Sequence, residues 1–354
     1  MDLKRVEKIK EILRSKNIEC YLTTDVKNIY YLTGFLDIPG ATLNMLIQPE
    51  GEPLLLVTPL SLEAAISDAK DCVVEGIAVG ESMNEHLIKE ITNISAKRTG
   101  YDSLQLQTYL DLTKSMETEF LDMGNIISRQ RRIKDDEEIS LIQRACEIAD
   151  IGMDAAVEAI RSGVREYEIA SQAEYEMRKN GSMGTAFETL VASGPRSAYP
   201  HGVSGDRKIL DGDIVTVDLG AVWKGYCSDI TRTVIVGKPR ERDLRIMQKV
   251  MKAHDKALEE MRSGVEAISI DSLARKTLGT RLKPHFVHGL GHGVGLAIHE
   301  APTLSQTTKD ILEAGNVVTD EPGVYFHDYG GFRIEDTVLV MKEGCRKLTC
   351  ASYQ

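Results

Sequence analysis

A stretch of alternating glycines and histidines constrains the fold of this chain most. Residues 285–300 read HFVHGLGHGVGLAIHE, with glycine at every second position from Gly289 to Gly295. His288 and His292 have the spacing of a helical zinc-peptidase pair, but each glycine costs a helix about 1 kcal/mol relative to alanine. We therefore expect one extended strand here, whose bare glycine face lies against another backbone or a ligand.

Length, charge and cysteine content limit the class of protein. A chain of 354 residues can bury more than one core, and its net charge of −11 argues against nucleic-acid binding. The first seventeen residues read as a charged amphipathic helix rather than a signal peptide, and no apolar run is long enough to span a membrane. Six scattered cysteines fit a reducing compartment. These features predict a soluble cytoplasmic protein that binds neither nucleic acid nor a membrane.

The first 125 residues have the pattern of a small α/β domain. Residues 3–15 and the segment SLEAAISDAK read as helices, whereas ECYLTT and NIYYLTGF read as short strands. The segment LNMLIQPEGEPLLLV reads as two strands joined by a turn. We place the domain boundary near residue 125, before a long helix with acidic residues at its start and Gly163 after its end.

Residues 126–354 contain a weak internal repeat. Residues 156–170 and 257–271 share the sequence Arg-Ser-Gly-Val at an offset of 101. A further helical pattern, a glycine-containing segment with histidine and a two-strand pattern with two acids follow each copy. This succession predicts a domain made of two α+β halves around a pseudo-twofold axis.

Two acidic residues lie in the strand pattern of the first half. Residues 213–237 read as two strands joined by a short turn. A turn symmetric about Trp223 and Lys224 would place Asp218 directly opposite Asp229, whereas a slip of one residue would put them on opposite faces. Because Asp218 lies inside an apolar run, where an unpaired carboxylate is costly, we expect the pair to share a proton or a cation.

The second half carries a matching acidic pair. Glu321 follows one strand pattern, and Glu335 lies in the next one, after a double-glycine turn. Four carboxylates and one histidine suit Mn²⁺, Co²⁺, Fe²⁺ or Zn²⁺, and four carboxylates suit two such ions that share a bridging water or hydroxide. Asp320 and Asp336 are expected to point to the opposite strand face.

Three segments carry a resemblance to a known family. DLGAVWKGYCSDITRT, HGLGHGVGLAIHEAP and DEPGVYFHDYGGFRIED resemble the pita-bread metallopeptidases of family M24, in the branch of Xaa-Pro dipeptidases (prolidases) and aminopeptidase P. NIYYLTGF is similar to a segment of that family's creatinase-like N-terminal domain, so the resemblance covers nearly the whole chain. It implies a creatinase-type α/β domain over residues 1–125 and an α+β pita-bread domain with duplicated halves over residues 126–354.

The resemblance implies a role for each matching residue. It makes five residues the metal ligands, namely Asp218, Asp229, His292, Glu321 and Glu335. Glu321 would also act as the catalytic proton acceptor. His201 would bind substrate and assist proton transfer to the leaving nitrogen, and His299 would bind substrate and stabilise the tetrahedral intermediate. His288 would line the substrate pocket, and Arg333 would hold a metal-ligating carboxylate.

Plainer explanations exist for three of these residues. His288 could be a core histidine whose ring nitrogens are bonded to backbone. His201 could be an ordinary turn residue in Pro-His-Gly, and Arg333 could form only a surface ion pair. Tyr325 is expected to be a packing residue. Asp320 stands where many relatives carry an apolar residue and adds charge near the site, and the sequence does not assign it a role.

The resemblance also implies a reaction, a cofactor and an assembly. The reaction would be hydrolysis of the Xaa-Pro bond of dipeptides by a metal-bridging hydroxide at a dinuclear site. The cofactors would be two divalent ions per chain, Mn²⁺ or Co²⁺ before Zn²⁺ or Fe²⁺, and the assembly a homodimer. An Xaa-Pro aminopeptidase for longer peptides would use the same ligands, although the compact length favours the dipeptidase. A metal-free binding module is disfavoured because all five ligand positions are occupied by ligand-type residues.

Overall fold

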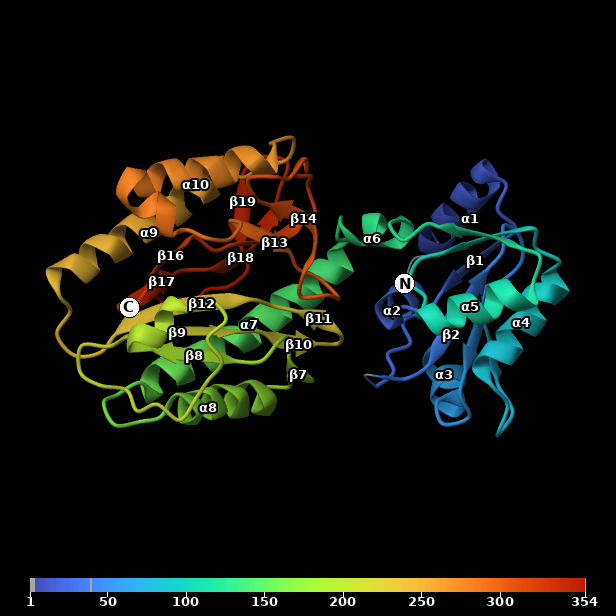
Figure 1. Ribbon diagram of the computed structural model, residues 1–354, viewed down its shortest axis with the longest axis horizontal. Coiled ribbons are helices and arrows are strands. Elements are labelled where there is room, and N and C mark those ends of the chain that lie inside the picture. The colour runs from blue at the N-terminus through green and yellow to red at the C-terminus, as the bar shows by residue number, and fades with distance from the viewer. Residues whose placement is uncertain (1–3, 39, 354) are drawn as a thin grey trace. The chain divides into compact units, whose positions relative to one another are not determined.

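The computed structural model describes residues 4–38 and 40–353, and its contacts divide them into two compact units, 4–131 and 132–353 (Figure 1). The short helix α6 (Ile126–Arg131) belongs by its contacts to the first unit. A domain boundary near residue 125 stays a prediction. Among the described residues, no helix is both long enough and apolar enough to cross a membrane.

The first unit is built on a mixed six-stranded sheet in the order β4-β3-β2-β1-β5-β6. Its strands are β1 (Cys20–Thr23), β2 (Leu43–Ile47), β3 (Leu54–Val57), β4 (Val73–Gly76), β5 (Arg98–Tyr101) and β6 (Glu119–Asp122). Its helices, besides α6, are α1 (Lys4–Lys16), α2 (Val26–Thr33), α3 (Leu62–Asp68), α4 (Met83–Ile94) and α5 (Leu106–Ser115). Buried leucines of β1, β2, β3 and α4 form part of its core. This is the α/β architecture that the sequence predicted.

One segment of the first unit has a different conformation from the predicted one. NIYYLTGF was expected to be a strand, but most of it lies in α2. The Asp25 side chain accepts hydrogen bonds from the backbone N–H groups of Lys27 and Asn28, and Gly34 ends the helix with a φ of 75°. These two caps satisfy free backbone groups at both helix ends. They stabilise a helix in a segment whose isoleucine and tyrosines would otherwise favour a strand.

His86 on α4 lies buried between two carboxylates of the first unit. Its Nδ1 is 2.9 Å from Oε1 of Glu81, and its Nε2 is 2.9 Å from Oε1 of Glu75. Burial lowers the pKa of His86, but the hydrogen bonds and charges of the two carboxylates outweigh burial and raise the net pKa above its usual value. The imidazolium form therefore stabilises the folded state.

We expect the stabilising effect of His86 to depend on pH. A raised folded-state pKa gives a contribution that is complete below the unfolded pKa of about 6.5 and is lost as the pH rises through the folded value. His86→Gln should therefore lower the thermal unfolding midpoint more at about pH 6 than at about pH 9. Calorimetry at both pH values measures this, with the exposed His327→Gln as the control. An equal loss at both pH values would show that His86 is neutral in the fold.

Two helix pairs define the duplicated halves of the second unit. The first pair is α7 (Asp136–Ala159) and α8 (Glu166–Lys179), and the second is α9 (Glu241–Glu260) and α10 (Ala267–Leu282). A copy of Arg-Ser-Gly-Val joins the helices of each pair. Gly163 and Gly264 have φ angles of 93° and 85°, and their N–H groups donate to Ile209 and Leu312 at 2.8 Å in both copies. The same turn in both halves confirms the duplication.

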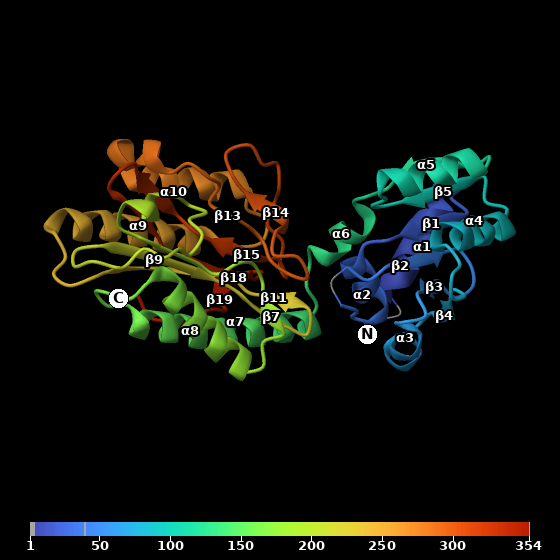
Figure 2. The ribbon, with the colours of Figure 1, turned by 60° about the horizontal axis from the view of Figure 1, so that its bottom comes forward.

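The sheets of the second unit lie between the two helix pairs in both views (Figures 1 and 2). The first half contributes β7 (Gly184–Thr185), β8 (Leu190–Ser193), β9 (Ile214–Leu219), β10 (Ala221–Trp223), β11 (Tyr226–Cys227) and β12 (Ile230–Ile235). The second half contributes β13 (Gly291–Gly293), β14 (Glu300–Leu304), β15 (Val317–Asp320), β16 (Gly323–Phe326), β17 (Gly330–Arg333), β18 (Asp336–Val340) and β19 (Cys345–Lys347). Short 3₁₀ turns occupy Gly194–Ala198 and Lys283–His285.

A backbone bridge between the two halves lies next to the acidic residues. Strands β12, β9 and β8 form one sheet, and β14, β13, β15, β18 and β19 form another in that order. Thr231 of β12 pairs with Glu335, the residue before β18, and the N–H of Glu335 donates to the carbonyl of Thr231 at 3.1 Å. This bridge places the acidic pairs of the two halves beside each other.

Candidate metal centre

The turn between the two acids of the first half lies one residue later than predicted. It consists of Lys224 and Gly225, whose positive φ angles of 45° and 80° fit the twist of a tight hairpin. Asp218 therefore lies opposite Thr231, and the prediction that it directly faces Asp229 is wrong. The register differs by two residues, which leaves both carboxylates on the same face, and the charge of Asp218 contributes to the raised pKa of Asp229.

The glycine–histidine segment is a much shorter strand than predicted. Only β13 pairs as a strand, and a register shift follows His292. The glycines do lie against backbone: a Cβ on Gly291 would sit 2.0 Å from the carbonyl oxygen of Thr319, and one on Gly293 would sit 2.5 Å from that of Ala301. The irregularity redirects the chain, so a flat strand through residue 298 does not form. The segment is also not helical, which excludes the helical zinc pair.

All five predicted ligands converge on one cleft of about 760 Å³. Asp218 lies on β9, Asp229 precedes β12, His292 lies on β13, Glu321 follows β15 and Glu335 precedes β18. Potential ligand atoms of Asp229, His292 and Glu335 lie within 4.8 Å of one another. Nε2 of His292 is 3.5 Å from Oε1 of Glu321 and 3.6 Å from Oδ2 of Asp229. The fold thus gathers residues that are more than one hundred positions apart in the sequence.

The carboxylates of this cleft carry more negative charge than their surroundings neutralise. Burial, followed by the charges of neighbouring carboxylates, raises the pKa of Asp229 and of Glu335 well above the usual values. Burial also raises the pKa of Glu321 to about 8, and Oδ1 of Asp218 has no hydrogen-bond partner among the described residues. Buried carboxylates of this kind must either take up protons or bind cations. The donor set therefore fits divalent metal ions.

Arg333 on β17 is the cationic partner of this acidic group. Its Nη2 donates to Oδ2 of Asp218 at 2.6 Å, and its Nε donates to Oγ1 of Thr231 at 3.0 Å. Its Nη1 donates to the hydroxyl of Tyr325 at 2.8 Å, and that hydroxyl lies 2.9 Å from Nε2 of His288. Arg333 is only 4% exposed, which excludes a surface ion pair. Tyr325 is part of the polar network and not the plain packing residue that the sequence suggested.

The four predicted histidines occupy different places in the cleft. Nδ1 of His292 lies 3.1 Å from the carbonyl of Gly293, which can only accept, so Nε2 is left free to face the acids. Burial lowers the pKa of His292 to about 4, which favours the neutral form that a metal ligand needs. The His299 ring lies 4.2 Å from the His292 ring, centroid to centroid. His201 and His288 also line the cleft, and His201 is exposed.

Two threonines bond to the side chains of predicted ligands, and sequence reasoning missed both. Oγ1 of Thr231 donates to Oε2 of Glu335 at 2.6 Å. Oγ1 of Thr319 donates to Oε1 of Glu321 at 3.2 Å and accepts from the N–H of His292 at 3.0 Å. Thr319 lies two residues before Glu321, so strand periodicity places both on one face. That spacing was the signal that could have identified it.

Two acids near the ligands face away from the cleft, as expected. Asp320 and Asp336 are paired across β15 and β18, and neither lines the cleft. Asp336 accepts from Arg232 at 2.8 Å and from Thr349 at 2.7 Å. Nε2 of His254 on α9 lies 3.1 Å from Asp336 and 3.9 Å from Asp320. These contacts attach α9 to the sheet that contains β15 and β18.

One other group of described residues, Glu75, His86 and Glu90, has ligand-type atoms within 4.8 Å of one another. Both ring nitrogens of His86 are already bonded to Glu75 and Glu81, as described above. This group is explained as a buried ion pair. The cleft of the second unit is the better metal centre because four carboxylates gather there around Arg333 and the neutral His292, which leaves a surplus of negative charge.

Comparison with known proteins connects this geometry to a family. Residues 140–342 match the model of metallopeptidase family M24, and residues 5–133 match that of the creatinase/prolidase N-terminal domain. The chain is 39% identical over 346 residues to the Xaa-Pro dipeptidase of Pyrococcus furiosus, covering 98% of this chain and 97% of that one.

Solved structures show the same relationship. The prolidase from Pyrococcus horikoshii OT3 superimposes with a TM-score of 0.94 at 39% identity, covering 99% of both chains. The X-Pro aminopeptidase from Thermotoga maritima MSB8 superimposes with a TM-score of 0.87 at 32% identity, covering 96% of this chain and 99% of that one. Both units of the chain therefore have counterparts in proteins that are named prolidase and X-Pro aminopeptidase.

Proposed function

This chain is a metallopeptidase of family M24 with a creatinase-type N-terminal domain and a duplicated pita-bread catalytic domain, and we propose that it hydrolyses the Xaa-Pro bond of dipeptides. The observation that carries the proposal is the convergence of four carboxylates and His292 on one cleft. The names of its relatives supply the proline preference, because no residue of the cleft specifies proline by its chemistry.

We propose Asp218, Asp229, His292, Glu321 and Glu335 as the ligands of two divalent ions. When bound, such ions lower the pKa of a shared water and polarise the scissile carbonyl. Glu321 accepts the proton of the attacking water, as its place in the cleft allows. Arg333 holds Asp218 in one orientation, and Thr231 and Thr319 do the same for Glu335 and Glu321.

The remaining cleft residues act on the substrate in this proposal. The ring of His299 lies against that of His292, beside the proposed metal site. From there His299 donates a hydrogen bond to the scissile carbonyl oxygen as that oxygen becomes negative. His201, at the exposed side of the cleft, contacts the substrate and passes a proton to the leaving nitrogen. His288, held by Tyr325 and the Gly289 carbonyl, lines the substrate pocket.

We propose Mn²⁺ or Co²⁺ as the metal, with Zn²⁺ and Fe²⁺ as alternatives, because the donor set has four oxygens and one nitrogen. We also propose a cytoplasmic homodimer. The cysteines of the described residues are all free thiols, which supports a reducing compartment. The family resemblance supports the dimer.

A peptide pair separates the dipeptidase from its alternative. We expect metal-stripped protein to be inactive and to cleave Ala-Pro after addition of Mn²⁺ or Co²⁺, with kcat/KM for Ala-Pro at least about tenfold above that for Ala-Pro-Ala. Chromatographic detection of released alanine measures both reactions, with Ala-Ala as the control for proline specificity. A preference for Ala-Pro-Ala would assign an Xaa-Pro aminopeptidase, as in the Thermotoga maritima neighbour. No cleavage of either peptide by metal-loaded protein would refute the proposed function.

A further inference from the structure

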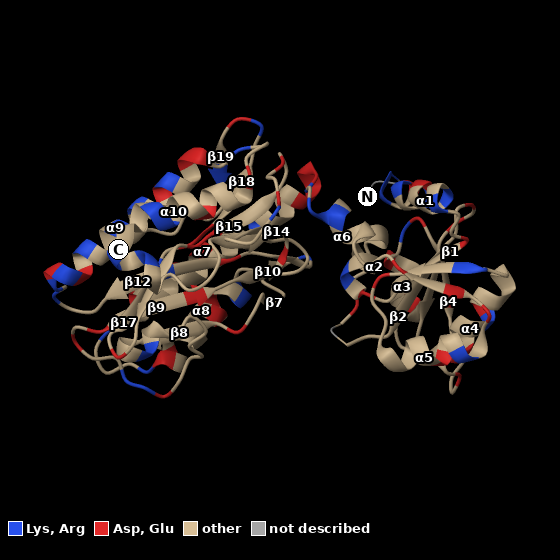
Figure 3. Cartoon of the chain, turned by 45° about the horizontal axis from the view of Figure 1, so that its top comes forward, with Lys and Arg blue, Asp and Glu red and all other residues tan. Residues whose placement is uncertain are grey.

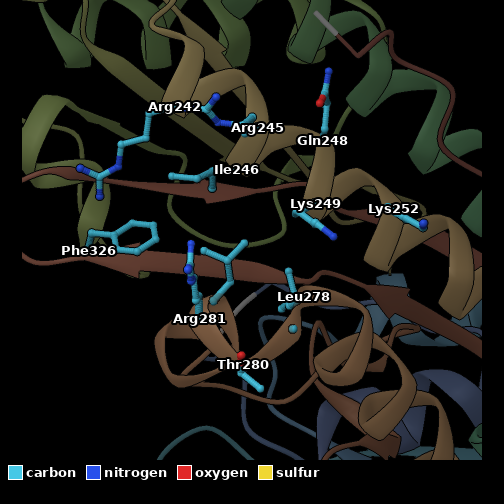
Figure 4. Close-up of a pocket in the computed structure, with 12 residues that line it drawn as sticks. Arg242, Arg245, Ile246, Gln248, Lys249, Lys252, Leu278, Thr280, Arg281 and Phe326 are labelled. Carbon is cyan, nitrogen blue, oxygen red and sulfur yellow. The ribbon is translucent and has the colours of Figure 1, made fainter.

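A second cavity of the catalytic domain is lined by basic residues and is separate from the metal cleft. It lies between α9 and α10 next to β16, has a volume of about 780 Å³, and shares no lining residue with the metal cleft (Figure 4). Five cationic side chains line it, and its lining includes no acidic residue: the cations are Arg242, Arg245, Lys249, Lys252 and Arg281. A cavity of this size is typical of small-molecule sites, which span about 300–1,000 Å³.

The cations of α9 form one continuous row. Arg242, Arg245, Lys249 and Lys252 are spaced by three, four and three residues, so they lie on the same face of the helix. Like charges at this spacing weaken a helix, and the acids of α9 relieve this little. Glu241 pairs with Arg245 at 2.6 Å, whereas Asp243 is buried and turned toward Tyr329. The row therefore has a surplus of positive charge.

Most of these cations are available to a ligand. Lys249, Lys252 and Arg281 are exposed, and the part of the chain that the structure describes gives them neither a hydrogen bond nor an ion pair. The chain as a whole has a net charge of −11, so its composition does not predict a group of unpaired cations in one place. Figure 3 shows basic residues along α9 and α10. Such a cavity concentrates anions at its mouth.

The floor of the cavity is apolar and partly preorganised. Leu278 and Phe326 contribute apolar surface to its lining, and the backbone of α10 breaks at Gly279, with a φ of 80° and a ψ of 172°. No atom lies within 4 Å of the position that a Cβ on Gly279 would take, so the floor is open there. The Arg242 guanidinium lies 4.2 Å from the ring centroid of Tyr329 and 5.6 Å from that of Phe326. These stacking contacts restrict the Arg242 side chain to fewer conformations.

We propose that this cavity binds a small organic polyphosphate, whose phosphates contact the arginines and lysines and whose apolar part lies on Leu278 and Phe326. Arginine forks match phosphate oxygens in pairs, and five cations require several negative charges on one compact ligand. A single peptide carboxylate supplies only one of these charges. The strongly negative chain repels an extended nucleic acid or an acidic protein, which would contact much more surface than the cavity.

Calorimetric titration of the metal-loaded enzyme tests this proposal. The probes are adenosine triphosphate, inorganic tripolyphosphate and hexaglutamate. The test variant is Lys249→Glu with Arg281→Glu, which reverses one exposed charge on each helix. The control is Lys276→Glu, an exposed lysine of α10 outside the cavity lining that has no recorded partner among the described residues. Hydrolysis of Ala-Pro serves as the folding check, since none of these residues lines the metal cleft.

We expect saturable binding of adenosine triphosphate that the test variant weakens by at least about tenfold and the control changes by less than about twofold. Tripolyphosphate should bind more weakly, because it cannot cover the apolar floor. The proposal is overturned if adenosine triphosphate does not bind, if it binds the test variant as tightly as the wild type, or if the control variant loses as much affinity as the test variant. It is also overturned if tripolyphosphate binds the wild type as tightly as adenosine triphosphate does, or if hexaglutamate binds more tightly. If the test variant loses Ala-Pro hydrolysis, Lys249→Gln with Arg281→Gln replaces it under the same criteria.

Discussion

Glu321→Gln is expected to reduce kcat/KM for Ala-Pro by on the order of 10³-fold or more, because it removes an anionic ligand and the proton acceptor together. The glutamine keeps the size of the side chain and its bond partner Thr319, so the fold should persist. Elemental analysis of the purified variant should show fewer metal ions per chain than the wild type. Steady-state kinetics at saturating Mn²⁺ then separates weakened metal binding from lost proton transfer.

The neighbouring Asp320→Asn is the matched control for this substitution. It makes the same chemical change one residue earlier, on the strand face that points toward His254 on α9. We expect its kcat/KM to stay within about threefold of the wild type, as for a residue that does not touch the reacting groups. If Asp320→Asn loses as much activity as Glu321→Gln, the assignment of strand faces is wrong. If Glu321→Gln keeps wild-type activity and metal content, Glu321 is neither ligand nor base.

The strand faces of the four acids could be predicted from sequence because a register error of two residues leaves each side chain on the same face. The observed turn after β10 lies one residue later than the predicted one, and this difference shifts every cross-strand partner by two residues. Since side chains alternate with a period of two, Asp218 and Asp229 kept the same face despite the wrong register. The same rule correctly separated Glu321 and Glu335 from Asp320 and Asp336. The strand face that a residue occupies depends on its position along its own strand, so it can be predicted from the neighbouring sequence.

Features that depend on distant neighbours were not predictable in this way. The expected strand at residues 286–298 is interrupted because Gly291 and Gly293 pack on carbonyl groups of Thr319 and Ala301, which the sequence does not place there. Tyr325 joins Arg333 to His288 only because β16 and β17 pair as they do. NIYYLTGF is the opposite case. Its caps at Asp25 and Gly34 are visible in the sequence, and they determine its conformation more strongly than the apolar β-type residues between them.

Arg275→Leu is expected to lower the free energy of unfolding of the catalytic domain by about 3–5 kcal/mol, the usual effect of breaking a buried ion pair from one side. Arg275 on α10 is 5% exposed and bonds to the fully buried Asp271 at 2.7 Å and 3.1 Å. It also donates to the carbonyls of Phe286 and His288. Urea unfolding followed by fluorescence of Trp223, the single tryptophan of the chain, measures the change in this domain.

The double variant Asp271→Asn with Arg275→Leu tests whether the loss comes from an unpaired charge. Without the charge on Asp271, the double variant should be more stable than Arg275→Leu alone, although the Asp271 side chain also accepts from the N–H of Leu290 at 3.1 Å. Lys276→Leu, at the exposed neighbour, should change stability by less than about 0.5 kcal/mol. Equal stability of the single and double variants would show that the charge of Asp271 is not what destabilises Arg275→Leu.

The pair also fixes the backbone of the segment that carries His288 and leads to His292, so Arg275→Leu should reduce kcat/KM even at temperatures where the domain remains folded.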